Sequence, residues 1–279
     1  MRLAFGHGTV NAFDEAAYLT LHALGLPPDH LAPHLDRQPT PGKIEKVLAL
    51  FERRIRERKP AAYLTGEAWL GEFRFHVDER VIVPRSYIAE LLHHDLAPWI
   101  VRPARIKSAL DLCTGSGCLA VMLASSFPRA RIDAADVSRD ALKVARRNVA
   151  DYALRDRVRL IRSDLFAALT GRRYDLIVSN PPYVRAASMH RLPQEYRWEP
   201  RLALAGGNDG LDITRAILCH AASHLNSGGL LVVEVGHNRA RVERAFPRTA
   251  FTWPHTSGGD DCVFLIYREE LPGFSLPAG

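Results

Sequence analysis

The chain has 279 residues, of which 47% are hydrophobic and 24% charged, and it contains 19 glycines and 18 prolines. This composition excludes a disordered or collagen-like chain, and the length suits one large domain with a smaller companion. The formal net charge is +6, and the excess of basic residues lies in residues 101–279. That excess is compatible with nucleic-acid contact, although solubility explains it as well.

The sequence shows no membrane span, secretory signal or metal motif. The longest uncharged runs, Leu112 to Pro128 and Ala216 to Val233, are interrupted by polar residues, glycine or proline, and the N-terminus lacks an apolar core. The four cysteines have neither the spacing of zinc ligands nor that of a disulfide framework. We therefore expect a cytoplasmic protein with buried thiols and no metal site.

Residues 13–58 are predicted to form helices, because apolar residues recur there every three or four positions. One helix is predicted to begin after Pro41, and its charged residues 52–59 are expected to form a solvated face with Glu–Arg pairs four positions apart. The opposite face of that helix is expected to be buried and carries Ile44, Val47, Leu48, Phe51 and Ile55.

From Ala61 the pattern changes to the alternation of a β-strand. Trp69 to Val77 alternates, Asp78 to Arg80 is predicted to turn, and Val81 to Val83 is predicted to return as a second strand. The predicted organisation is therefore a helical recognition domain at 1–62, a β-hairpin linker at 63–84 and a larger domain at 85–279.

From residue 108 onward, short apolar strands alternate with helical stretches. Repeated units of this length predict an α/β fold with a doubly wound, mostly parallel sheet, whose ligands bind beyond the carboxyl ends of the strands. The predicted strands are 109–112, 131–136, 158–161, 174–178, 230–235 and 262–267, and the predicted helices are 117–126, 139–152, 214–225 and 238–245.

The segment Asp111 to Gly117 closes the first strand and opens a helix. Gly115 and Gly117 let the backbone approach a ligand, and the free amides at the start of the helix can bond it. The segment lacks the third glycine of the dinucleotide fingerprint, and the Asp111 carboxylate suits a ligand with an ammonium or hydroxyl group. A purely structural turn explains the same residues.

Acidic residues follow the next two strands. Asp136 ends the second strand, where a carboxylate can bond both ribose hydroxyls of a nucleoside; the alternative is a helix cap, for which Ser138 is better placed. After the third strand, Asp164 is a candidate acceptor for an adenine amino group, with Leu165 and Phe166 covering the ring. A capped turn explains these last residues equally well.

The segment Asn180-Pro181-Pro182-Tyr183 directly follows the fourth strand. The two prolines stiffen the loop and leave carbonyl oxygens as acceptors beside the Asn180 amide and the Tyr183 ring. Such a loop suits a planar NH2 group, because Asn180 and a proline carbonyl can each accept one N–H while the ring packs on the plane. Holding the hydrogens in this way turns the nitrogen lone pair toward an electrophile.

These motifs resemble those of S-adenosylmethionine-dependent methyltransferases that act on amino groups in planar systems. Within that superfamily, the chain is similar over almost its whole length to the protein N5-glutamine methyltransferases. This similarity implies a class I methyltransferase fold with a seven-stranded sheet, S-adenosylmethionine as the cofactor and a glutamine side-chain amide as the methyl acceptor. The segments that carry it are 60–66, 83–86, 199–204 and 206–211.

One branch of that family is the most similar. The segments that resemble the enzymes modifying a glutamine of ribosomal protein uL3 are Phe5 to Thr9, Trp69-Leu70, Val77 to Val81, Asp111 to Cys118 and the ending Gly258 to Phe264. The sister branch modifies peptide release factors at a Gly-Gly-Gln motif and usually has glycine at the position of Cys113. Members of the uL3 branch usually begin with a further helical segment, so the abrupt start before Phe5 indicates a missing stretch or a different start codon.

The resemblance also implies partners and roles for residues. The partner would be uL3, either as the free protein or within a ribosomal assembly intermediate, with a secondary contact to ribosomal RNA. Asn180, Pro181, Pro182 and Tyr183 would hold the glutamine amide, and Arg85 falls in a family motif without an assigned role. The expected cofactor-binding residues are Asp111, Cys113, Thr114, Gly115, Ser116, Gly117, Asp136, Ser163, Asp164, Leu165 and Asn180.

Three alternatives remain open at this point. The chain could modify release factors, since both substrates present the same amide. An adenine N6-methyltransferase also presents an asparagine and prolines to an NH2 group, but no separate target-recognition domain for DNA is found in the sequence. A non-catalytic RNA-binding or ribosome-assembly module is compatible with the basic residues 101–279.

Overall fold

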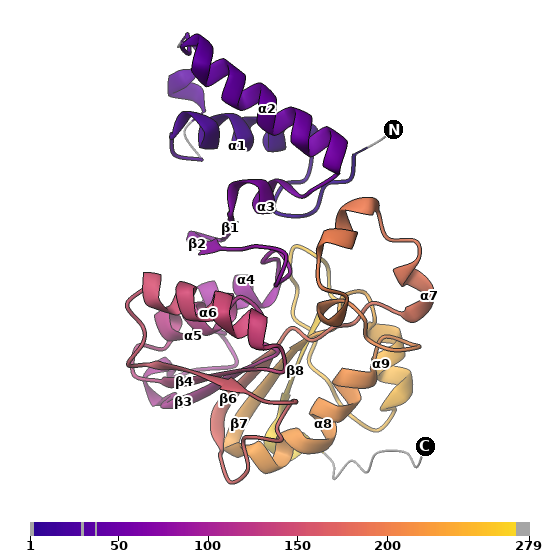
Figure 1. Ribbon diagram of the computed structural model, residues 1–279. Coiled ribbons are helices and arrows are strands. Elements are labelled where there is room, and N and C mark those ends of the chain that lie inside the picture. Colours follow the sequence, from indigo (N-terminus) through magenta and orange to yellow (C-terminus); the bar gives the residue numbers. More distant parts are fainter. Residues whose placement is uncertain (1–2, 29–30, 37, 272–279) are drawn as a thin grey trace.

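The computed structural model describes residues 3–28, 31–36 and 38–271, so residues 1–2 and 272–279 of the predicted outer domains lie outside the described residues. A helical part, a short hairpin and an α/β part follow one another along the chain (Figure 1). None of the helices in these described ranges combines the length and apolar character that a membrane crossing requires.

The helical part confirms the helices predicted within residues 13–58. The Asn11 side chain accepts the Asp14 N–H and starts the first α-helix, which Gly25 ends in the left-handed conformation with φ of 68°. The elements of this part are α1 (Ala12–Leu24), the 3-10 turn η1 (Ala32–His34), α2 (Pro41–Glu57) and α3 (Ala61–Thr65).

The predicted burial of α2 is wrong in part. Ile44, Leu48 and Ile55 are exposed by 43%, 58% and 59%, whereas Arg54, expected on a solvated face, is only 3% exposed. The Arg54 guanidinium lies inward because its Nε donates to Glu15 Oε1 at 2.7 Å and its Nη1 to Glu195 Oε1 at 3.3 Å. These ion pairs decide which face of the helix is buried.

The hairpin also differs from the prediction. It consists of β1 (Glu67–Leu70) and β2 (Phe73–His76), which pair antiparallel, and no strand forms at the predicted 81–83. Gly71 has φ of 59° and allows a tight turn directly after β1, so the chain reverses earlier than expected. The Val83 N–H bonds the Glu199 carboxylate at 3.0 Å instead of a neighbouring strand.

A six-stranded sheet in the order β5-β4-β3-β6-β7-β8 forms the centre of the α/β part and confirms the doubly wound, mostly parallel architecture. All its neighbouring strands are parallel except the last pair, β7 and β8. The strands are β3 (Ser108–Leu112), β4 (Arg131–Asp136), β5 (Val158–Arg162), β6 (Tyr174–Ser179), β7 (Leu225–Glu234) and β8 (Val263–Tyr267).

The expected seventh strand is absent from the sheet of the described residues. Thr252 forms only an isolated antiparallel bridge with Leu265, in which each N–H bonds the other residue's carbonyl at 3.0 and 2.8 Å. Pro254 follows two residues later and has no N–H to donate, so the pairing cannot extend in that direction. The seventh strand of the expected fold is reduced to this single bridge.

Helices cover both faces of the sheet (Figure 1), and the strands are buried on both sides. Ala109 of β3 packs in the same core as α4, α5 and α6, whereas its neighbour Leu110 packs in the core with α8. The remaining elements are α4 (Ile88–His93), η2 (Pro103–Arg105), α5 (Cys118–Ser126), α6 (Arg139–Asp151), α7 (Ala186–Met189), η3 (Gln194–Trp198), η4 (Arg201–Ala203), α8 (Asp212–His224), α9 (Arg239–Ala245) and η5 (Arg268–Glu270).

A buried carboxylate joins the helical part to the α/β part. Glu195 of η3 is fully buried and accepts from Arg58 Nε at 2.7 Å, from Arg54 and from the Ala4 N–H at 3.0 Å. Burial by itself would raise the pKa of Glu195, but the hydrogen bonds from Arg58, Ala4 and Arg54 lower it to about 2. The domain division at 62 and 84 stays a prediction, and α3 crosses the first of these boundaries.

Candidate active site

A cavity of about 330 Å³ lies at the carboxyl ends of β3, β4, β5 and β6. This is where ligands bind in doubly wound sheets. It brings together most of the residues that the sequence predicts for the site: Cys113, Thr114, Gly115, Ser116, Asp136, Ser163, Asp164, Leu165, Asn180 and Pro182. Four predicted residues are not part of its lining, namely Asp111, Gly117, Pro181 and Tyr183.

The turn after β3 presents backbone to the cavity. Gly115 has φ of 56°, and its N–H donates to Asp136 Oδ2 at 2.8 Å. Cys113 has φ of 64°, a left-handed conformation that favours glycine. Gly117 has φ of 79°, and it also has a packing reason, because an added Cβ would lie 3.1 Å from the Cβ of Ala145 in α6.

Asp111 supports this turn from beneath. Its side chain is fully buried, and Oδ2 accepts the hydroxyl hydrogen of Thr114. Its Oδ1 has no hydrogen-bond partner among the described residues. Burial raises the pKa of Asp111 to about 7, with a smaller contribution from the nearby Asp136.

Asp136 ends β4 and is held by two backbone amides. Oδ2 accepts from Gly115 N–H and Oδ1 from Ser138 N–H, both at 2.8 Å. Burial raises the pKa of Asp136, and these amide bonds partly offset the rise. Ser138, not Asp136, caps α6 by accepting the Ala141 N–H at 3.1 Å, which confirms the predicted cap. Each oxygen of Asp136 therefore keeps capacity for a further donor at the cavity.

The loop after β5 contributes Ser163, Asp164 and Leu165 to the cavity lining. The Ser163 hydroxyl is used within the loop, since it donates to Leu165 O at 2.6 Å and accepts from Ala168 N–H at 3.0 Å. The Asp164 carboxylate is exposed and has no protein partner among the described residues. The expectation that Phe166 covers a ligand ring is wrong: it is buried and stacks on His224, with ring centroids 4.5 Å apart.

The loop after β6 places Asn180 at the cavity. No described residue bonds the Asn180 side-chain amide, so both its oxygen and its NH2 are available to a ligand. Tyr183 is not part of the cavity lining: its hydroxyl donates to Glu234 Oε1 at 3.2 Å, and its ring contacts Gly236, where a Cβ would lie 2.7 Å away. These contacts fix the Tyr183 ring, and its packing on a ligand stays a prediction.

Glu234, at the end of β7, is a supporting residue that the sequence analysis missed. Its fully buried carboxylate accepts from the Ser86 hydroxyl at 2.6 Å, from Tyr87 N–H at 2.9 Å and from Tyr183. Burial raises the pKa of Glu234 to about 7 despite these bonds. A lone acid inside the apolar strand 230–235 was the signal that could have revealed it.

Arg85, which had no assigned role, lines the cavity and forms a two-pronged bond with Glu199. Its Nη1 and Nη2 donate to Oε1 and Oε2 at 2.5 and 2.6 Å. Burial by itself would raise the pKa of Glu199, but Arg85 and then His7 lower it to about 2. This pair fixes the start of segment 199–207, which we call the roof of the cavity. Pro200, Leu202, Ala203 and Ala205 of the roof contribute apolar surface to the lining.

The chain is similar in sequence to known families. Residues 91–194 match the family described as Methyltransferase small domain, and residues 6–66 match the PrmC N-terminal domain. A protein of Neisseria meningitidis serogroup B named ribosomal protein uL3 glutamine methyltransferase is 60% identical over 97% of this chain and 89% of its own. A Bordetella pertussis protein of the same name is 57% identical over 97% and 91%.

Solved structures of lower identity share the fold. A methyltransferase from Pyrococcus furiosus is 18% identical with a TM-score of 0.51, covering 81% of this chain and 98% of its own. The catalytic domain of hMettl16 is 13% identical with a TM-score of 0.53, covering 84% and 83%. At these identities the similarity shows the fold alone.

Proposed function

Because the chain belongs to the family of ribosomal protein uL3 glutamine methyltransferases, we propose that it transfers a methyl group from S-adenosylmethionine to the side-chain amide nitrogen, N5, of a glutamine in uL3. The observation that carries the proposal is the shared cavity. The Gly115 turn, Asp136 and the unengaged amide of Asn180 all line the same 330 Å³.

The residues present fit S-adenosylmethionine. The cavity is within the size range of small-molecule sites. Asp136 keeps acceptor capacity for two ribose hydroxyls, and the exposed Asp164 carboxylate is an acceptor for an adenine amino group. Asp111 Oδ1 is buried beneath the Gly115 turn and has no hydrogen-bond partner among the described residues. The positive charge of an ammonium group bound above that turn would stabilise the Asp111 carboxylate. Ser116 and Thr114 line the same side of the cavity.

The chemistry follows from the Asn180 loop. The bound cofactor supplies an activated sulfonium methyl group. The Asn180 oxygen accepts one N–H of the glutamine amide, and a carbonyl of the two-proline segment Pro181-Pro182 accepts the other. With its hydrogens held in this way, the amide nitrogen presents its lone pair in one direction. Orientation of this kind is worth a large part of the roughly 7 to 11 kcal/mol available from positioning.

The roof of the cavity fixes the loop that holds the amide. Val184 N–H bonds Leu204 O at 2.9 Å, and Gly206 N–H bonds Val184 O at 2.8 Å. A Cβ on Gly206 would lie 2.7 Å from the Pro182 carbonyl oxygen, so the close approach requires glycine there. The segment 199–207 therefore sets the position of the two prolines relative to the cofactor turn.

The uL3 substrate is supported by a second cavity of about 470 Å³ between α1 and the β1–β2 hairpin. Asp14, Glu67 and Glu72 give its lining an acidic character, and Trp69, 37% exposed, adds an aromatic surface. A ribosomal protein presents lysine and arginine for RNA, and such a basic segment suits this lining. The residues that distinguish uL3 from release factors must lie outside the Asn180 loop, since both substrates present the same amide to it.

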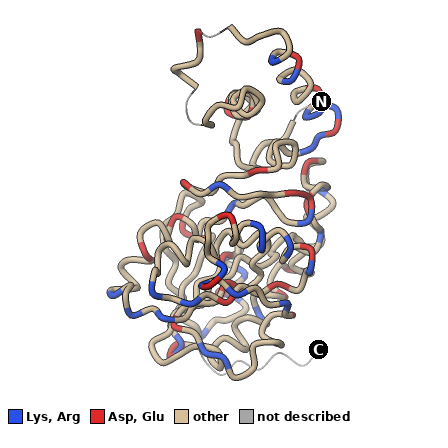
Figure 2. The backbone as a smooth tube through the Cα atoms, turned by 60° about the vertical axis from the view of Figure 1, so that its left-hand side comes forward, with Lys and Arg blue, Asp and Glu red and all other residues tan. Residues whose placement is uncertain are grey.

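A secondary contact with ribosomal RNA has weaker support. The sequence is basic beyond residue 100, but Figure 2 shows acidic and basic residues along both parts of the chain. An RNA contribution would make methylation of an assembly intermediate more sensitive to salt than methylation of free uL3.

The decisive experiment is a side-by-side methyl-transfer assay with purified uL3 and a purified release factor, followed by mass spectrometry of the modified peptide. We expect preferential methylation of uL3. Preference for the Gly-Gly-Gln glutamine would overturn the substrate while leaving the amide chemistry intact.

A second experiment tests whether Asn180 holds the glutamine amide. Asn180→Ala should reduce turnover by about 100-fold or more, equivalent to about 2.7 kcal/mol. Asn180→Asp keeps one acceptor oxygen and should lose less. Turnover of Asn180→Ala within a few-fold of the parent would show that the loop is only a turn.

A further inference from the structure

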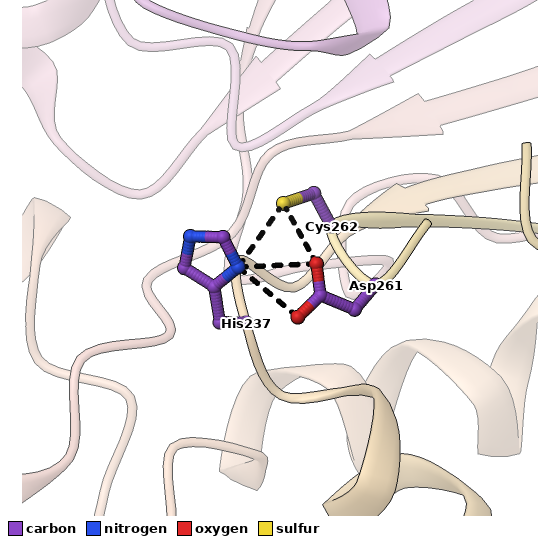
Figure 3. A group of neighbouring side chains, drawn as sticks. All are labelled: His237, Asp261 and Cys262. Atoms are coloured by element: carbon purple, nitrogen blue, oxygen red, sulfur yellow. Dashed lines mark hydrogen bonds and ion pairs between the residues drawn. The ribbon is translucent and has the colours of Figure 1, made fainter. Parts of the chain in front are cut away.

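Three side chains outside the cavity converge on one point (Figure 3). His237 Nδ1 lies 3.1 Å from both Asp261 oxygens, and Cys262 Sγ lies 3.6 Å from His237 Nδ1 and 3.5 Å from Asp261 Oδ1. His237 and Asp261 are 24 residues apart in the sequence, which is why motif spacing did not reveal the cluster.

The arrangement is not that of a catalytic triad. In a triad the carboxylate and the nucleophile bond opposite nitrogens of the imidazole, whereas here both approach Nδ1. Three donor atoms of different types that face one another in this way have the form of a metal site.

We propose that His237, Asp261 and Cys262 bind a zinc ion. For Zn–S bonds of about 2.3 Å and Zn–N and Zn–O bonds of about 2.0 Å at tetrahedral angles, the donor atoms stand about 3.3 to 3.6 Å apart. The three separations of 3.1 to 3.6 Å are close to these values. Thiolate, imidazole and carboxylate together are a ligand set that zinc accepts.

The ligands sit on segments that other contacts fix. Cys262 is fully buried directly before β8, and its Sγ also lies 3.3 Å from Gly258 O. A Cβ on Gly258 would lie 2.5 Å from the ring of Tyr87, so this loop is packed against the start of α4. Cys262 coordinates as the thiolate and releases its proton to the buffer.

The open side of the cluster faces solvent. The side chains of His237 and Asp261 are 70% and 41% exposed, which leaves room for an ion and for water as the fourth ligand. The neighbouring Arg239 does not compete, because it pairs with Glu243 at 2.9 Å and its Nη1 donates to Asp260 O at 3.1 Å.

A zinc ion here would tie the turn after β7 to the start of β8. His237 follows Gly236, which contacts the ring of Tyr183. The ion would therefore fix Gly236, which contacts Tyr183 of the Asn180 loop, and would lie outside the cavity. The inference stands on this geometry and does not depend on the methyl acceptor.

The test uses full-length protein stripped with a chelator and then titrated with Co²⁺ or Zn²⁺. We expect one ion per chain, a thiolate-to-cobalt charge-transfer band, and displacement of cobalt by zinc. His237→Ala should weaken zinc binding on the order of 100-fold or more, measured by competition with a chromogenic chelator. His255→Ala is the matched control, since His255 is also exposed and paired with an aspartate, Asp260, outside the cluster.

Equal zinc affinity in His237→Ala and the parent would overturn the proposal, as would a cobalt spectrum without the thiolate band. His237 is exposed, so its alanine variant should keep the parent's melting temperature without metal. Asp261→Asn provides a second surface variant, and loss of zinc binding in both, with retention in His255→Ala, would support the site.

Discussion

Replacing Glu234 with glutamine tests whether the buried Glu234 carboxyl group, which contacts the loop of Asn180 through Tyr183, is protonated in the folded protein. The glutamine oxygen can accept from Ser86 and Tyr87 N–H as the carboxylate does, while its NH2 donates to the Tyr183 hydroxyl oxygen. The variant thus keeps the shape and the bonds of the protonated acid and cannot ionise. We expect Glu234→Gln to be more stable than the parent above neutral pH.

The magnitude follows from the pKa. Burial raises the pKa of Glu234 from 4.5 to about 7, so the folded state holds a proton that the unfolded state has lost in this window. The stability that this proton contributes is complete below pH 4.5 and is lost as the pH rises through 7. At about 1.4 kcal/mol per pH unit, the loss is about 3 kcal/mol.

Urea unfolding at pH 4.5 and pH 8 measures the difference. The free energy of unfolding of Glu234→Gln relative to the parent should rise by about 3 kcal/mol between the two pH values. Asp111, whose pKa burial also raises to about 7, titrates alike in both proteins and cancels. An unchanged difference would show that Glu234 is ionised in the folded protein and refute the reasoning.

Three further predictions concern the cofactor, the roof and the domain contact. Asp136→Ala should weaken S-adenosylmethionine binding in calorimetry by about 1 to 3 kcal/mol, since ribose hydroxyls lose their acceptor; unchanged affinity would remove Asp136 from the site. Gly206→Ala should cost about 1 to 3 kcal/mol of stability through collision with the Pro182 carbonyl and should lower methyl transfer about tenfold, which full turnover would contradict. Glu195→Ala should lower the free energy of urea unfolding by about 3 kcal/mol, because two buried arginines lose a shared carboxylate.

Two exposed ion pairs serve as controls for these variants. Asp140→Ala removes a carboxylate four residues after Asp136 that forms an ion pair with the exposed Lys143, and cofactor affinity should not change. Glu52→Ala removes a surface partner of Arg56, and its effect on unfolding should stay within about 1 kcal/mol. A Glu195→Ala effect no larger than that of Glu52→Ala would show that the buried pairs do not hold the parts together.

The cofactor side of the site was predictable because its signals are local. Asp136 and the Gly115 turn each end a strand, and parallel strands bring their carboxyl ends to one edge. The cap at Ser138 could also be predicted, since it depends only on the first turn of α6. Asn180 follows β6 by the same rule, so its place at the cavity needed no long-range information.

The supporting contacts were not predictable from local patterns. Arg54 resembles a surface residue in the sequence, but its bonds to Glu15 and to Glu195, 141 residues away, turn it inward. The contacts of Tyr183 with Glu234 and Gly236, more than 50 residues away, could not be predicted either. The hairpin was misplaced because Gly71 permits an earlier turn than the alternation of residues indicated.

By itself, the sequence determined the order along the chain of the six strands of the sheet, the edge of the sheet where ligands bind and the residues that end each strand there, because periodicity and strand termini are properties of adjacent residues. The tertiary structure alone decided which polar side chains are buried and with what partner. Glu195, Glu199 and Glu234 each meet partners more than 100 residues away. Their free energies depend on desolvation and on partners that only the folded chain brings together.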